Sequence, residues 1–144
     1  MPGELVAVAA IVVGFGLTVI MFRIQRELWV QEKHPDWPNW LAWSDYLIIL
    51  SLLLGVIVSV ILLLPDPTPR VKAFASAACV AAFILQVGYI PAILAHYRIE
   101  MGRKRAEEGK PRERGEPIER RVVRVSVFLA TVVFIFMLWE HLRR

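Results

Sequence analysis

Hydrophobic residues in this chain are gathered into four long runs that polar segments separate. The runs cover Leu5–Phe22, Tyr46–Leu64, Ala73–Ala95 and Val122–Trp139. Each is about 20 residues long, which is the length that an α-helix needs to cross the hydrocarbon core of a bilayer. The alternation of a membrane β-barrel strand is missing from Leu47–Leu54. We therefore predict an all-α integral membrane protein whose four transmembrane helices form an up-down bundle, with residues 1–144 as a single domain.

Lysines and arginines are divided unequally between the two sides that such a bundle would have. Of the 17 basic residues, 13 lie in or directly beside segments 23–44 and 96–121, and 4 lie in the second connection and at the C-terminus. Loops rich in lysine and arginine stay in the cytoplasm. We predict that segments 23–44 and 96–121 are cytoplasmic loops, that both termini are outside (N-out and C-out), and that the protein spans the plasma or inner membrane several times. Basic residues follow the first run rather than precede it, so we expect a retained helix and not a cleaved signal peptide.

The first cytoplasmic loop is rich in tryptophan. It contains four of the five tryptophans in the chain: Trp29, Trp37, Trp40 and Trp43. Indole combines an apolar body with one N–H donor and prefers the headgroup layer of a membrane. We predict that these residues are interfacial anchors. Pro35 should end the first helix, and Pro38 suits the first turn of a new one, so the second helix is expected to begin near Pro38.

The third connection, residues 96–121, is the longest polar segment. Opposite charges stand four residues apart at Glu100/Lys104 and Arg103/Glu107, which predicts that the third helix projects into the cytoplasm. Pro117 can open the following helix. Basic residues available to anionic lipid or to a protein partner are Arg98, Arg103, Lys104, Arg105, Lys110, Arg112 and Arg114. Acidic residues are interspersed among them, and this pattern argues against a nucleic-acid partner.

Small residues recur at four-residue spacing on three of the predicted helices. Because a four-residue step stays on one helical face, such residues form ridges along which two helix backbones can approach closely. The helix-packing candidates are Ala10, Gly14 and Thr18, then Ser51, Gly55 and Ser59, and then Ala77 and Ala81. The ridges could bind helices of the same chain or of a second copy.

The central parts of the four runs contain no charged residue and no histidine, which argues against a transporter with a buried acid. One polar side chain, Gln86, lies near the middle of the third run, followed by Gly88, Tyr89 and Pro91. Pro91 removes a backbone donor and kinks its helix. Broken helices near the middle of a bilayer hold the sites of many transporters. These four residues are therefore the candidates for a permeation path or ligand site; the alternative is an interhelical hydrogen bond beside an ordinary kink.

Residues for catalysis or cofactor binding are sparse. The chain has one cysteine, Cys79, and three scattered histidines. It lacks a glycine-rich phosphate loop and paired metal-ligand motifs. We therefore predict no metal, no cofactor and no catalytic residues. An interfacial enzyme using His34 and Asp36 is the weakest hypothesis.

Two functional hypotheses remain. The first is a non-enzymatic accessory or scaffold subunit that self-associates or binds a membrane partner, with a basic cytoplasmic loop that contacts anionic lipid or protein. The alternative is an oligomeric channel or small-solute transporter with its path at Gln86–Pro91.

Overall fold

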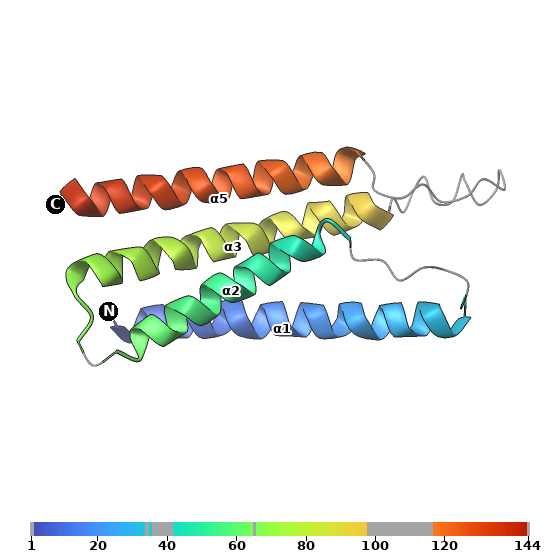
Figure 1. Cartoon of the computed structure of the whole chain (residues 1–144), viewed down its shortest axis with the longest axis horizontal. Coiled ribbons are helices and arrows are strands. Elements are labelled where there is room, and N and C mark those ends of the chain that lie inside the picture. The colour runs from blue at the N-terminus through green and yellow to red at the C-terminus, as the bar shows by residue number, and fades with distance from the viewer. Residues whose placement is uncertain (1, 34, 36–41, 65, 98–116, 144) are drawn as a thin grey trace.

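A computed structural model describes residues 2–33, 35, 42–64, 66–97 and 117–143, and these residues form four helices (Figure 1). The helices are α1 (Pro2–Lys33), α2 (Asp45–Leu62), α3 (Pro69–Tyr97) and α5 (Pro117–Arg143). Each is long and apolar enough to cross a membrane, and the described residues include no strand. The prediction of an all-helical protein with four candidate membrane spans is confirmed.

Helix α1 is longer than the apolar run that predicts it. It continues through Arg23 to Lys33, so the first part of segment 23–44 is helical, and α1 ends two residues before Pro35. The reason is local: Arg23 forms an ion pair with Glu27 one turn later, and neither glycine nor proline interrupts the chain before Pro35. At 32 residues, α1 is about 48 Å long, well beyond the thickness of a hydrocarbon core.

The other helix starts follow proline and capping chemistry. Helix α3 begins at Pro69, where Thr68 accepts a hydrogen bond from the Val71 amide through its side-chain oxygen at 3.4 Å. Helix α5 begins at Pro117, as the sequence predicts. Helix α2 begins at Asp45. The prediction that this helix begins near Pro38 is wrong, because residues 42–44 form a turn just before Asp45; Pro38 itself lies outside the described residues.

Consecutive helices run in opposite directions, and α1 and α5 lie at opposite edges of the molecule (Figure 1). Helix α3 packs against each of the other three helices. Within the most apolar part of each helix, 50% of the residues of α3 are buried inside the chain, against 17% for α1 and for α5. Helix α3 is therefore the central element of the fold.

The interior consists of two clusters of apolar side chains. Near the starts of α2 and α5, the cluster contains larger residues such as Leu47, Leu85 and Tyr89. The second cluster lies toward the opposite end of the bundle and is built mostly from small residues, among them Ala75 and Ala78. Small side chains let backbones approach closely, which is how helices associate in lipid.

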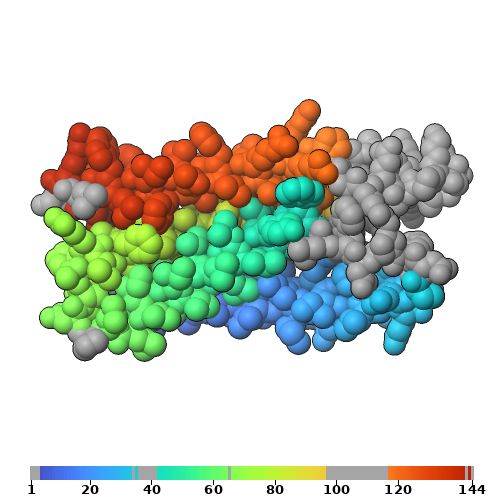
Figure 2. Space-filling view, viewed as in Figure 1, coloured from blue at the N-terminus to red at the C-terminus, as the bar shows by residue number. Residues whose placement is uncertain are grey.

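The outer surface is apolar over most of its length. Figure 2 shows one face, on which α5, α2 and α1 are visible side by side. Exposed hydrophobic side chains include Leu53, Val60, Phe128, Val132 and Phe136. A surface of this kind suits contact with lipid tails rather than with water.

Candidate functional site

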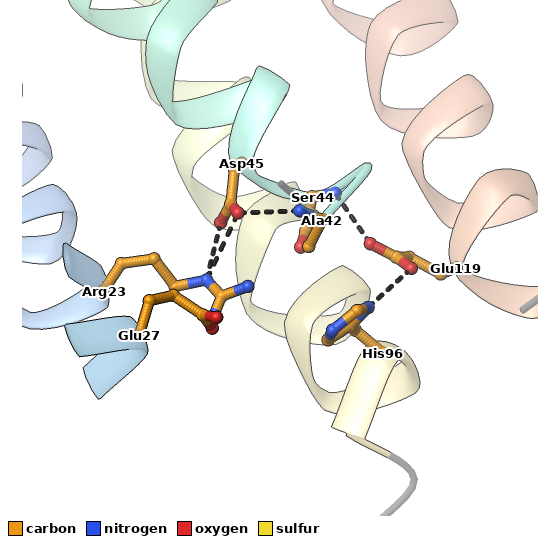
Figure 3. A network of polar contacts seen from close by, with 7 residues as sticks. All are labelled: Arg23, Glu27, Ala42, Ser44, Asp45, His96 and Glu119. Atoms are coloured by element: carbon orange, nitrogen blue, oxygen red, sulfur yellow. Dashed lines mark hydrogen bonds and ion pairs between the residues drawn. The ribbon is translucent and has the colours of Figure 1, made fainter. Parts of the chain in front are cut away.

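Polar side chains from all four helices meet at one end of the bundle. This polar layer consists of Arg23, Glu27, Ser44, Asp45, His96 and Glu119 (Figure 3). It lies where α1 passes the start of α2, where α3 approaches its end and where α5 begins. The layer contains two buried acidic residues, Asp45 and Glu119.

The first half of the polar layer joins α1 to α2. The Arg23 Nε atom lies 3.1 Å from Asp45 Oδ1 and 3.2 Å from Oδ2, and the two side chains are 10% and 8% exposed. Arg23 also pairs with Glu27. Asp45 Oδ2 accepts a further hydrogen bond from the Ala42 amide at 2.9 Å. Asp45 thus binds a cation on α1 and an amide just before its own helix.

The second half joins α5 to α2 and α3. Glu119 Oε1 accepts a hydrogen bond from the Ser44 amide at 2.8 Å, and Glu119 Oε2 lies 3.0 Å from His96 Nδ1 (Figure 3). One fully buried carboxylate therefore holds the beginnings of α2 and α5 and the end of α3 together. Buried carboxylates are stable only when such partners replace water.

Both acids also bind amides of the turn that leads into α2. They lie near the positive end of the α2 helix dipole, which favours a negative group. Asp45 binds the Ala42 amide from the adjacent turn, and Glu119 binds the Ser44 amide from another helix. These hydrogen bonds and ion pairs hold the ends of the four helices together.

The candidate pathway residues have different surroundings in the structure. Gln86 is buried, and its Nε2 atom donates to the Val12 carbonyl of α1 at 2.6 Å. Gly88 packs against Ser126 of α5, Tyr89 is buried, and Pro91 is exposed within α3. Gln86 thus contributes to the contact between α1 and α3, and its role in permeation stays a prediction.

The helix-packing candidates divide by helix. Ser51, Gly55, Ala77 and Ala81 are buried within the chain, and Ser59 is half-buried. In contrast, Ala10, Gly14 and Thr18 are exposed, and a side chain added at Gly14 would meet nothing within 4 Å. The glycine of α1 that faces the bundle is Gly16, next to Leu52. The ridge Ala10–Gly14–Thr18 is therefore exposed rather than buried against another helix of its own chain.

Of the predicted anchors, Trp29 and Trp43 are exposed at the polar end of the bundle. Lys33 Nζ lies 4.0 Å from the Trp29 ring centroid, and Arg120 Cζ lies 5.2 Å from that of Trp43. The remaining anchors and the basic loop fall outside the described residues; these are Trp37, Trp40, Arg98, Arg103, Lys104, Arg105, Lys110, Arg112 and Arg114.

The sequence analysis does not identify the polar layer, because Arg23, Asp45 and His96 each lie beside the end of an apolar run. A signal was present. In antiparallel neighbours, the residue that closes one apolar run lies opposite the residue that opens the next, and here these are Arg23 and Asp45. The described residues hold no group of three or more histidine, cysteine, aspartate or glutamate side chains arranged to bind a metal ion.

Comparison of this chain with models of known protein families, with curated proteins and with solved structures finds no match.

Proposed function

We propose that this protein is a non-enzymatic, multi-pass membrane subunit, an accessory or scaffold that self-associates or binds a membrane partner. In this proposal the polar layer lies at the cytoplasmic side, both termini lie outside, and the bundle holds its basic cytoplasmic segments against anionic lipid or protein. The observation that carries it is the polar layer itself. Buried acids from two helices are bound to groups of neighbouring helices or their caps, so they serve to fix the bundle.

The mid-span amide supports the same reading. A pore or carrier would use Gln86 to bind a solute or line a path, whereas here its Nε2 atom is bound to the Val12 carbonyl. An amide used in this way stabilises helix association by about 0.6 kcal/mol. The channel or small-solute transporter remains the alternative proposal, and flux measurements separate it from the scaffold.

The end of α1 supplies a surface for a partner. Beyond Arg23 the helix runs ten further residues, a rise of about 15 Å past the polar layer. Ile24, Leu28 and Trp29 are each at least half exposed on this extension. Apolar side chains on a helix that leaves the hydrocarbon core are suited to contact with another protein or with the membrane surface.

Purified protein in liposomes provides the decisive test. We expect chemical cross-linking at low protein density to give a dimer or larger species, and we expect dye and ion flux to equal that of empty liposomes. Protein that remains monomeric with no partner captured by cross-linking in native membranes would contradict the scaffold. Flux above background that Gln86→Leu abolishes would establish the alternative.

The proposed orientation has its own test in intact cells. Starting from a Cys79→Ser chain, single cysteines are placed at Gln31, at the end of α1, and at Asp66, between α2 and α3; both positions are exposed. We expect a membrane-impermeant maleimide to label the Asp66→Cys protein directly and the Gln31→Cys protein only after permeabilisation. The reverse pattern would show that the polar layer faces outward.

A further inference from the structure

The first turns of α5 carry a concentration of positive charge. Arg120, Arg121 and Arg124 are all exposed, and they fall within roughly 100° of the helix circumference. The acid of this segment, Glu119, faces inward to Ser44 and His96. Because residues 117–124 contain no other acid, the outer side of this segment presents three guanidinium groups without a neighbouring carboxylate of its own helix. We call these three residues the arginine face.

Two aromatic residues from the start of α2 lie beside the arginine face. Arg120 Cζ is 5.2 Å from the ring centroid of Trp43, whose ring lies 5.9 Å from that of Tyr46. Both aromatic side chains are exposed. The hydrogen bond from the Ser44 amide to Glu119 fixes the start of α2 against the start of α5 (Figure 3). This hydrogen bond therefore helps to set the position of Trp43 relative to Arg120.

The chemistry of this surface matches a phospholipid. Guanidinium groups bind phosphate oxygens through paired hydrogen bonds. Tryptophan and tyrosine place their rings at the level of the headgroup and glycerol. Past the arginine face, α5 exposes Val125 and Phe128, along which an acyl chain can lie. A soluble phosphate compound would use the arginines alone, whereas a lipid would use all three features.

We propose that the starts of α2 and α5 form a binding site for an anionic phospholipid. The arginine face holds the phosphate, Trp43 and Tyr46 contact the headgroup region, and the apolar side of α5 receives a chain. This proposal deepens the lipid contact of the proposed function, because it places a specific site on the bundle itself rather than on segment 96–116.

Fluorescence quenching by brominated lipids tests the site in the full chain. In a variant that retains Trp43 as its only tryptophan, the other four being phenylalanine, the protein is reconstituted into phosphatidylcholine vesicles. These contain a minor fraction of either brominated phosphatidylglycerol or brominated phosphatidylcholine. We expect brominated phosphatidylglycerol to quench Trp43 fluorescence at least twice as strongly as brominated phosphatidylcholine does. In the triple variant Arg120→Gln/Arg121→Gln/Arg124→Gln, both lipids should quench Trp43 equally.

The opposite end of α5 supplies a matched control. Arg143 Cζ lies 3.4 Å from the Trp139 ring centroid, so it is also an arginine–tryptophan pair, but without the arginine face. A variant with Trp139 alone should show little preference between the two lipids. Equal quenching of Trp43 by both lipids, or a preference that persists in the triple variant, would overturn the site. Cross-linked oligomers that persist in the triple variant would leave the scaffold proposal intact, so the two proposals fail separately.

Discussion

Replacing Glu119 by alanine is expected to destabilise the folded protein by about 3 kcal/mol. The substitution removes the acceptor of the Ser44 amide and a partner of His96 in one step; the first contact is buried and the second is part-buried. The Ser44 amide that is left behind must stay buried without Glu119 as its acceptor or draw water between the helices. Equilibrium unfolding of the full chain in mixed micelles with increasing denaturing detergent, followed by circular dichroism, measures the change.

Two further variants define what Glu119 contributes. Glu32 is exposed on α1, and Glu32→Ala removes an acid of the same type without removing a buried contact; its stability should match that of the wild type. Glu119→Gln keeps an oxygen that accepts from Ser44 and offers an amide to His96, so it should lose less than half of the alanine effect. If Glu119→Ala unfolds at the same detergent fraction as Glu32→Ala, the polar layer does not hold the bundle together.

The existence of four helices could be predicted from the sequence because each apolar run has the length of a membrane span. The ends of the helices could be predicted only in part. Hydropathy reports where lipid surrounds a helix and not where the backbone stops being helical. Arg23–Lys33 is polar yet helical, because residues four apart pair and proline comes only afterwards. Proline, in contrast, did locate the start of α5 at Pro117.

The polar layer was harder to predict because its members are far apart in sequence. Glu119 and Ser44 are separated by 75 positions, and Glu119 and His96 by 23. Each looks like an ordinary boundary residue when taken alone. They are brought together by the packing of α3 between α2 and α5 and by the position along the bundle at which each helix begins. A single sequence reports neither the packing of the helices nor the positions at which they begin.

The small-residue ridges show the same limit at the level of a single residue. Spacing identifies a helical face but not the neighbour of that face. Gly14 lies on a four-residue ridge and yet has open space around it. Gly88 lies outside the three ridges named from the sequence, although an added Cβ there would lie 2.5 Å from the Cβ of Ser126. The tightest approach at any glycine of the described chain is therefore between α3 and α5.

Gly88→Ala should accordingly destabilise the protein by about 2 kcal/mol. Two β-carbons cannot remain at that distance, so α3 and α5 must move apart along their contact. Overpacking of this kind costs about 1–3 kcal/mol. This cost is partly offset by the higher helix propensity of alanine, which stabilises a helix by up to about 1 kcal/mol relative to glycine. Detergent-induced unfolding of the full chain measures the net effect. The loss of stability should exceed that caused by a glycine-to-alanine substitution at a position without a close neighbour.

Gly14→Ala is the matched control, because it makes the same chemical change within a helix and adds a methyl group to open space. It should leave stability unchanged or raise it by up to about 1 kcal/mol. Combining Gly88→Ala with Ser126→Gly moves the methyl group from α5 to α3 and should recover part of the loss, so the two substitutions should be non-additive. Additive effects, or equal stability of the Gly88→Ala and Gly14→Ala proteins, would show that α3 and α5 do not meet at Gly88. In that case the contact between α3 and α5 at Gly88 could not explain how Glu119 is placed next to His96 and Ser44.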